Sequence, residues 1–286
     1  MAMMQVLCIF RAACFSPGMV ERDEAILRAV AERLRTAHYA VSMLHEEDFT
    51  FHTPMPDIVL HMARSPRSLE ILKCWQASGC RVLNSADAVS GVEREALALR
   101  CAALRIPTPT TWIVSTESPI IELLKTTEGV LAPMAFPCWV KRTGACAQCP
   151  DDVCFVSDAV EYGRCLASFR TRSIDKVVVM EHLEGAAVKF YGVRGTGFFC
   201  VVPFDKLGYN KFSRVSLVEE AYGDELNLDD LEKQLQLTGF HLDVYGGDAI
   251  VGADGVARLI DLNDWPSFSV CREEAAEAIA RLVLGE

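Results

Sequence analysis

Acidic and amide side chains near the end of the chain could hold a metal ion. Asp261 and Asn263 lie two residues apart in the segment RLIDLNDWP, so in a strand their side chains share one face. Asp248 lies thirteen residues before Asp261, and a hairpin through the intervening Gly-Ala-Asp-Gly turn would place these two carboxylates opposite each other. Mg²⁺ takes one or two protein carboxylates together with phosphate oxygens. The alternative is a solvated hairpin face, and the pattern alone does not decide between the two.

A second group of residues could bind phosphate. The apolar segment FPCWV ends in the adjacent cations Lys141 and Arg142, which places charge at the edge of a predicted sheet. Lys141 could reach a phosphate as a point charge. Small residues follow in the loop 143–152, and their backbone N–H groups could cover phosphates. Taken alone, an ordinary surface hairpin explains this segment too.

The third candidate is a strand that breaks and returns. The segment VVVMEHLEG ends at Gly185, and the next strand-like run carries Lys189 and Arg194. Backbone groups exposed at such a break could pair with the edge of an adenine ring. Glu184 could bind ribose hydroxyls, while Lys189 and Arg194 could face phosphate or substrate. By itself, an ordinary hairpin is the simpler explanation.

The elements that must position these residues fall into two parts. In the first hundred residues, strand-like runs alternate with helical patterns, which predicts βαβ units and a parallel sheet. Ser90 and Glu93 form a capping-box pattern for the last helix of this part, and Pro107 ends it. We place a domain boundary near residue 105. The predicted strands are 6–10, 39–44, 57–62 and 81–83, and the predicted helices are 23–35, 66–76 and 92–103.

The second part has the pattern of an α+β structure, with antiparallel strands and helices on one side. Several of its strands are short and close enough to form hairpins. The predicted strands are 112–114, 138–141, 153–156, 177–181, 187–193, 197–202, 248–251 and 258–263. Helical patterns cover 119–125, 159–169, 228–237 and 271–284.

Composition excludes several classes of function. The net charge is −11 with no block of Lys and Arg, so we expect no nucleic-acid partner. No apolar run approaches the roughly 20 residues of a membrane span, and no export signal is evident. We therefore expect a cytoplasmic protein whose twelve cysteines are reduced. A zinc site or a redox pair among Cys138, Cys146, Cys149 and Cys154 is the alternative to ordinary loop and core thiols.

The three candidate segments follow one another as in ATP-grasp enzymes, and from about Asn84 to its end the chain resembles that superfamily. NSADA at 84–88 resembles the N-S-x-x-A segment of these enzymes, and IPTPT at 106–110 resembles G-I-P-x-P-x-T. FPCWVK at 136–141 resembles the strand with the phosphate lysine, and MEHL at 180–183 resembles the adenine hinge. Asp248 together with DLNDWP at 261–266 resembles the metal ligands.

The resemblance implies an α/β N-terminal lobe (1–105) and an α+β ATP-grasp domain (106–286) whose two subdomains, 106–183 and 184–286, clasp ATP. The implied ligands of Mg²⁺, or of Mn²⁺ as a substitute, are Asp248, Asp261 and Asn263. The implied ATP-binding residues are Arg94, Lys141, Glu181, His182, Leu183, Glu184 and Lys189. Lys141, Lys189 and Arg194 are the implied catalytic residues. Arg94 stands where these enzymes usually have a lysine, and the loop after Lys141 has one glycine where they often have several.

Two branches of the superfamily are most similar. The ribosomal-protein glutamate ligases share the first two segments, whereas the inositol trisphosphate kinases share the Asp-x-Asn-x-x-Pro strand. We expect an ATP-dependent ligase that joins a carboxylate to an amine or thiol through an acylphosphate. A kinase acting on a hydroxyl, or a binder without turnover, is the alternative. The expected partner is a small molecule or peptide with an anionic group, oriented by Arg194, Lys211 or Arg214; a homodimer is left open.

Overall fold

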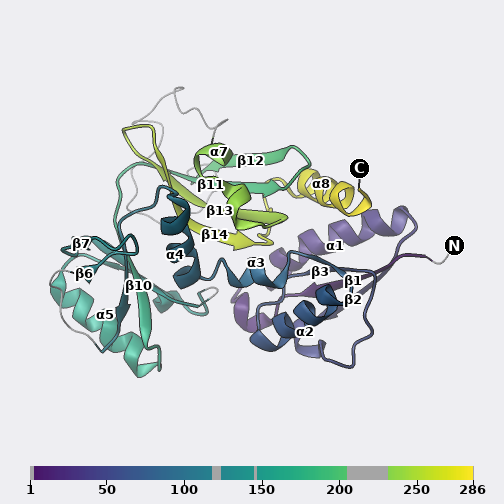
Figure 1. The fold of residues 1–286 in the computed structure, drawn as a ribbon, viewed down its shortest axis with the longest axis horizontal. Coiled ribbons are helices and arrows are strands. Elements are labelled where there is room, and N and C mark those ends of the chain that lie inside the picture. The colour runs from purple at the N-terminus through teal and green to yellow at the C-terminus, as the bar shows by residue number, and fades with distance from the viewer. Residues whose placement is uncertain (1–2, 118–123, 145–146, 205–230, 286) are drawn as a thin grey trace.

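The computed structural model describes residues 3–117, 124–144, 147–204 and 231–285. Its N-terminal part is a parallel sheet in the order β2-β1-β3-β4, covered by helices (Figure 1), so the predicted α/β lobe is confirmed. The strands are β1 (Gln5–Phe10), β2 (Ala40–His45), β3 (Ile58–His61) and β4 (Arg81–Leu83). The helices are α1 (Val20–Thr36) and α2 (Pro66–Ala77), with short 3₁₀ turns η1 (Ala13–Phe15) and η2 (Glu46–Asp48).

Two short helices, α3 (Ala86–Ser90) and α4 (Arg94–Leu104), lead out of this lobe. The predicted capping box at Ser90 is wrong. The Ser90 hydroxyl donates back to the carbonyl of Ala86 at 3.0 Å, as serines inside helices often do, so Ser90 closes α3. The cap of α3 is Ser85, whose hydroxyl accepts the Ala88 N–H at 3.2 Å.

The first antiparallel sheet has the order β5-β10-β8-β9. Its strands are β5 (Thr111–Ser115), β8 (Cys138–Arg142), β9 (Val153–Val156) and β10 (Lys176–Glu181), accompanied by η3 (Pro150–Asp152) and α5 (Ala159–Thr171). The helix predicted over 119–125 is wrong at 124–125, which lie in β6 (Leu124–Lys125) and pair with β7 (Leu131–Ala132). The rest of that prediction lies outside the described residues.

The second antiparallel sheet has the order β12-β11-β13-β14. Its strands are β11 (Ala186–Val193), β12 (Phe198–Pro203), β13 (Val244–Val251) and β14 (Ala257–Asp264). Beside it lie α7 (Leu231–Gln234), η7 (Leu237–Phe240) and α8 (Arg272–Leu284). The helix predicted over 228–237 therefore forms only as α7 within the described residues, and its first three positions lie outside them.

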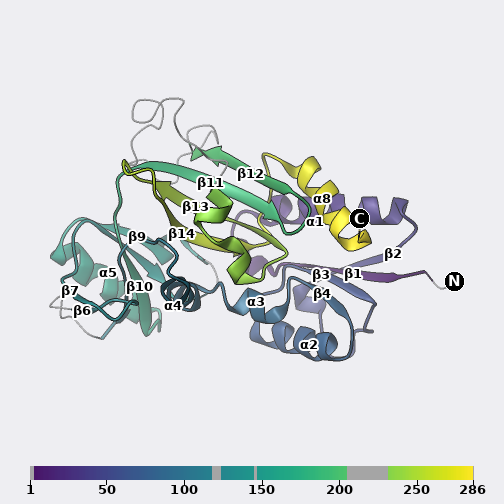
Figure 2. The same cartoon turned by 45° about the horizontal axis from the view of Figure 1, so that its top comes forward.

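The N-terminal lobe and the second sheet share one apolar core. Ile26 and Val30 of α1 belong to the same buried cluster as Ile279 of α8, and the two helices lie side by side in both views (Figures 1 and 2). The first sheet packs on a separate core with α5. The lobe and the second sheet thus form one packed unit, against which the first sheet is set. No helix among the described residues is long and apolar enough to cross a membrane.

The cysteines give a first prediction. Every cysteine in the described ranges is a free thiol, and burial raises the pKa of Cys8, Cys101 and Cys138 to about 12. We expect a thiol-specific reagent to modify the exposed Cys14 and Cys74 first and to count all twelve thiols after unfolding without reductant. Fewer thiols, or one equivalent of zinc that is lost in Cys149→Ser, would overturn this prediction.

Candidate active site

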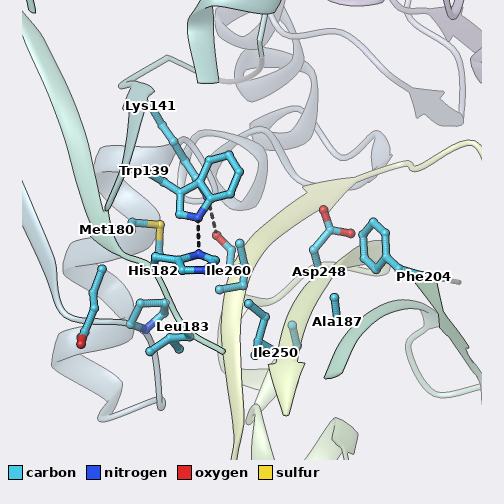
Figure 3. A pocket seen from close by; sticks show the side chains of 13 residues that line it. Trp139, Lys141, Met180, His182, Leu183, Ala187, Phe204, Asp248, Ile250 and Ile260 are labelled. Carbon is cyan, nitrogen blue, oxygen red and sulfur yellow. Dashed lines mark hydrogen bonds between the residues drawn. The ribbon is translucent and has the colours of Figure 1, made fainter. Parts of the chain in front are cut away.

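A cleft of about 490 Å³ lies between the two antiparallel sheets (Figure 3). One wall comes from β8 and β10, and the other comes from β11, β13 and β14. Most of its lining is apolar, which suits a flat aromatic ring, with charged groups at Lys141, Glu181 and Asp248. The lining residues are Pro109, Trp139, Lys141, Met180, Glu181, His182, Leu183, Ala187, Phe204, Asp248, Ala249, Ile250 and Ile260.

The predicted pair of carboxylates faces across the hairpin. The register of β13 and β14 places Asp248 opposite Asp261, after a one-residue shift from the register at the turn. Each carboxylate also has a cation beside it. Lys189 Nζ lies 2.6 Å from Asp248 Oδ1, and Arg94 Nη2 lies 3.7 Å from Asp261 Oδ2. The two cations offset the repulsion between the facing carboxylates.

A β-bulge shapes this end of the cleft. After the Asp248–Asp261 pair, the register shifts so that Ala249 pairs with Leu259, and Ile260 is the extra residue. Bulges re-aim side chains next to functional sites. Here Ile260 lines the cleft beside Asp261, whereas Leu259 belongs to the apolar core. The Ile260 carbonyl also accepts a hydrogen bond from Lys141 Nζ at 3.4 Å.

Two glycines of β13 allow the strands to pack closely at the predicted metal ligands. Gly246 pairs with Asn263, and a Cβ on Gly246 would lie 2.8 Å from the carbonyl oxygen of Phe190 on the neighbouring strand. A Cβ on Gly247 would collide with the carbonyl oxygen of Asp261. Any larger residue at either position would push β13 away from β14 or β11.

Lys141 is a buried cation whose pKa is shifted by its surroundings. It lies on the interior strand β8, not at a sheet edge as predicted, and it is only 5% exposed. Burial lowers the pKa of Lys141 to about 8, against the opposing effect of Asp261. The amine is therefore still mostly protonated at pH 7, and a nearby nucleotide phosphate would stabilise that charge.

This pKa predicts how nucleotide binding depends on pH. In the free protein, the Lys141 amine is protonated below pH 8 and neutral above it. A bound triphosphate favours the protonated amine, so binding above pH 8 must take up a proton, and affinity falls by up to about tenfold per pH unit. Calorimetric titration with ATP and Mg²⁺ at pH 7, 8 and 9, in buffers of different ionisation enthalpy, measures both effects. Equal affinity at all three pH values without proton uptake would contradict the assignment.

The segment after β10 has the features of a nucleotide hinge. The Glu181 N–H donates to Thr110 at 2.9 Å and the His182 N–H donates to Pro137 at 3.2 Å, whereas no described residue accepts the Leu183 N–H. Trp139 Nε1–H donates to His182 Nδ1 at 3.1 Å (Figure 3). Burial lowers the pKa of His182, so the neutral imidazole carries its proton on Nε2. The hinge thus offers a backbone donor and an imidazole donor to a planar ligand.

The structure brings most predicted site residues together but leaves others apart. Arg94, Lys141 and Lys189 surround the two carboxylates, and Asn263 follows on the same strand. Arg194 lies past the far end of β11, 46% exposed and paired with Asp243. Glu184 is exposed beyond the hinge. Lys211 and Arg214 lie outside the described residues.

Asn84 has a structural role that the motif did not indicate. Its Oδ1 accepts the N–H groups of Asp243 and Val244 at 2.6 and 2.8 Å, and its Nδ2 donates to the Val244 carbonyl at 2.7 Å. Asn84 thereby anchors the start of β13 to the N-terminal lobe. The sequence also did not indicate that Trp139 binds His182 or that Phe204 lines the cleft. Neither position shows a distinctive pattern.

The donor set at the carboxylates fits Mg²⁺. Among the described residues, no three His, Cys, Asp or Glu side chains gather as a metal site. Asp248 and Asp261 with the amide of Asn263 instead give two carboxylates and one neutral oxygen. That is the incomplete hard-oxygen set that Mg²⁺ uses when phosphates and water supply its other ligands. These three residues are the ones that would hold the ion.

Comparison with known proteins identifies the fold. No family model matches the sequence, and no curated protein is significantly similar to it. Among solved structures, a RimK domain ATP-grasp protein from Sphaerobacter thermophilus is 17% identical, with a TM-score of 0.66 over 98% of this chain and 100% of that chain. D-alanyl-alanine synthetase A from Vibrio cholerae is 10% identical, with a TM-score of 0.67 over 100% of this chain and 98% of that chain. D-alanine–D-alanine ligase from Bacillus anthracis, complexed with ATP, is 12% identical, with a TM-score of 0.64 over 99% and 98%. The chain has the ATP-grasp fold, as predicted.

Proposed function

We propose that this protein is an ATP-dependent ligase that joins a carboxylate to an amine or thiol. The observation that carries the proposal is the convergence of the buried Lys141 with the facing carboxylates Asp248 and Asp261 at one cleft. Two of the solved structures of similar fold are a D-alanyl-alanine synthetase and a D-alanine–D-alanine ligase. This supports ligation as the class of reaction.

In the proposed complex, the base lies between the hinge and the apolar wall that contains Ile250 and Ile260. The backbone N–H of Leu183 would donate to the base, and the phosphates would extend toward Lys141. Phosphoryl transfer needs little covalent help from a protein, so positioning and neutralisation of charge dominate. Lys141, Arg94 and Lys189 are the cations that neutralise the triphosphate. Lys189 would leave Asp248 as the metal binds.

The reaction has two steps. A substrate carboxylate oxygen attacks the γ-phosphorus, the bond to the β,γ-bridging oxygen breaks, and ADP leaves. The amine or thiol then attacks the carbonyl carbon of the acylphosphate and expels phosphate. Asp248, Asp261 and Asn263 would hold Mg²⁺, which would supply positive charge to offset that of the phosphates.

A kinase is the second candidate. Asp261 rather than a glutamate at this strand position favours it, because the same Asp-x-Asn-x-x-Pro pattern is similar to that of inositol trisphosphate kinases. In that case a substrate hydroxyl attacks the γ-phosphorus and no phosphate is released. The third candidate is a degenerate site that binds ATP without turnover. It is suggested by Arg94 in place of the usual lysine and by the glycine-poor loop after Lys141.

Product analysis separates these three functions. The protein is incubated with ATP, Mg²⁺ and pools of carboxylates, amines, thiols and polyols, and ADP, phosphate and new mass peaks are measured. A ligase forms ADP and phosphate only when both substrates are present. A kinase forms ADP and a phosphorylated acceptor without free phosphate, and a binder forms neither. Either of the last two results would reject ligation.

A further inference from the structure

Two arginines of the N-terminal lobe contact the end of β14, the strand that carries Asp261 and Asn263. Arg64 forms an ion pair with Asp264, and their side chains are 2% and 0% exposed. Arg11 Nη2 donates to the carbonyl oxygens of Asp264 at 3.3 Å and Trp265 at 3.1 Å. These contacts begin at the residue directly after Asn263.

Both arginines are themselves held in place. Asp23 accepts from Arg11 Nη1 at 3.1 Å and from the Ser16 hydroxyl at 2.6 Å. The buried carboxylate of Glu46 accepts the backbone N–H of Arg64 at 3.0 Å. Asp23 thus limits the positions that the planar fork of Arg11 can adopt, and Glu46 fixes the backbone from which the Arg64 side chain extends.

The chain turns sharply where the arginines hold it. Trp265 has a positive φ of 40°, is fully buried, and donates from Nε1 to the carbonyl of Leu83 at 3.2 Å. A left-handed conformation is uncommon for a bulky residue and persists only when its surroundings fix it. The backbone that leads out of Asn263 is therefore determined by contacts with the N-terminal lobe.

The place of the two arginines in the sheet is also informative. Arg11 directly follows β1, and Arg64 comes three residues after β3. β1 and β3 are the neighbours at which the strand order β2-β1-β3-β4 reverses direction. In open α/β sheets, functional groups gather at the carboxyl ends of strands at this switch point. Here that edge of the lobe is docked onto the predicted metal strand.

Stability alone does not account for a buried ion pair. Replacing such a pair by apolar residues of similar volume is often neutral or stabilising, because desolvation offsets the attraction between the charges. We propose that Arg64 and Arg11 are positioning residues, which set the orientation of Asn263 and Asp261 toward the metal by holding Asp264 and Trp265. This inference rests on the proposed function of the same site.

Metal binding in the absence of turnover tests the inference. The probe is Mn²⁺ with a non-hydrolysable ATP analogue, and bound Mn²⁺ is measured by electron paramagnetic resonance. The double variant Arg64→Met/Asp264→Leu removes the ion pair without leaving an unpaired charge. We expect it to fold and to bind the analogue without metal as wild type does, but to need at least fivefold more Mn²⁺ for half-saturation.

Two further variants complete the experiment. Arg11→Lys keeps the charge but loses the planar fork that spans two carbonyls, so it should weaken Mn²⁺ binding even if the double variant fails to fold. Arg33→Met is the control, since Arg33 also joins the lobe to the C-terminal half of the chain, through Glu273 at 2.7 Å and Glu277 at 3.2 Å, but on α8 rather than on β14. Its Mn²⁺ affinity should equal that of wild type.

The outcomes separate this inference from the proposed function. Wild-type protein that binds no Mn²⁺ with the analogue overturns both. If the wild-type protein binds Mn²⁺ and both Arg11→Lys and the folded double variant bind it equally well, only the positioning role is overturned. An equal loss in Arg33→Met would show that any contact between the lobe and the C-terminal half of the chain has this effect, and it would also reject the specific role of Arg64 and Arg11.

Discussion

The variant Asp261→Asn is expected to lose at least a hundredfold in turnover while keeping its fold. The substitution preserves shape and one acceptor oxygen but removes the charge that faces Asp248 across the hairpin. A metal shared between protein and triphosphate depends on that charge. The Asp261 side chain is 21% exposed and its ion pair with Arg94 is long, at 3.7 Å, so the stability loss should stay near 1 kcal/mol or less. ADP release measured against Mg²⁺ concentration, with thermal unfolding alongside, tests both expectations.

The control for this variant is Asp254→Asn, in the turn of the same hairpin. Its side chain is 50% exposed and pairs only locally, with Arg258, so activity should remain at the wild-type level. Strand alternation would suggest Asp264→Asn, since Asp264 faces away from Asp261. That choice is wrong, because Asp264 is fully buried against Arg64. If Asp261→Asn is as active as Asp254→Asn, Asp261 is an ordinary hairpin carboxylate and not a metal ligand.

The second large effect is expected for Lys141→Met. Methionine has a similar length and packs where the lysine stem is buried, but it cannot neutralise a phosphate. We expect nucleotide affinity to fall about a hundredfold and turnover to fall by a factor on the order of 10² to 10³, the usual scale for one preorganised electrostatic contact.

The same variant should be more stable than wild type without nucleotide. Because the folded protein lowers the pKa of Lys141 to about 8 from 10.5, folding disfavours the protonated amine at neutral pH. Removing the amine should therefore raise the free energy of unfolding by roughly 1 to 3 kcal/mol. Calorimetry and denaturant unfolding at pH 7 measure the two effects, with the exposed Lys176→Met as control. A variant that binds ATP normally, or that loses affinity only because it unfolds, contradicts the role given to Lys141.

Local sequence signals predicted the features of the site that depend on local geometry. The hairpin that carries Asp248 and Asp261 follows from the glycine-containing turn between two strand-like runs. Counting from that turn would pair Asp248 with Ile260, and the β-bulge brings Asp261 opposite Asp248 instead. The parallel lobe follows from alternating strands and helices, since such connections favour parallel pairing.

Features set by long-range packing could not be predicted in this way. The bulge at Ile260 has no signature in the alternation of RLIDLN. The burial of Asp264 depends on an arginine two hundred residues away in the sequence. Arg194 has a suitable charge, but it follows the last residue of β11, five residues beyond Lys189, and lies outside the cleft.

Thermal unfolding of the wild-type protein with and without ATP and Mg²⁺ tests whether the cleft binds nucleotide. A ligand at a hundred times its dissociation constant adds about 2.7 kcal/mol to the stability of the folded state, which raises the melting temperature of a protein of this size by several degrees. We predict that millimolar ATP with Mg²⁺ produces this shift, and that Lys141→Met and Asp261→Asn reduce it sharply. An unchanged melting temperature for the wild-type protein would contradict the assignment of the cleft as a nucleotide site.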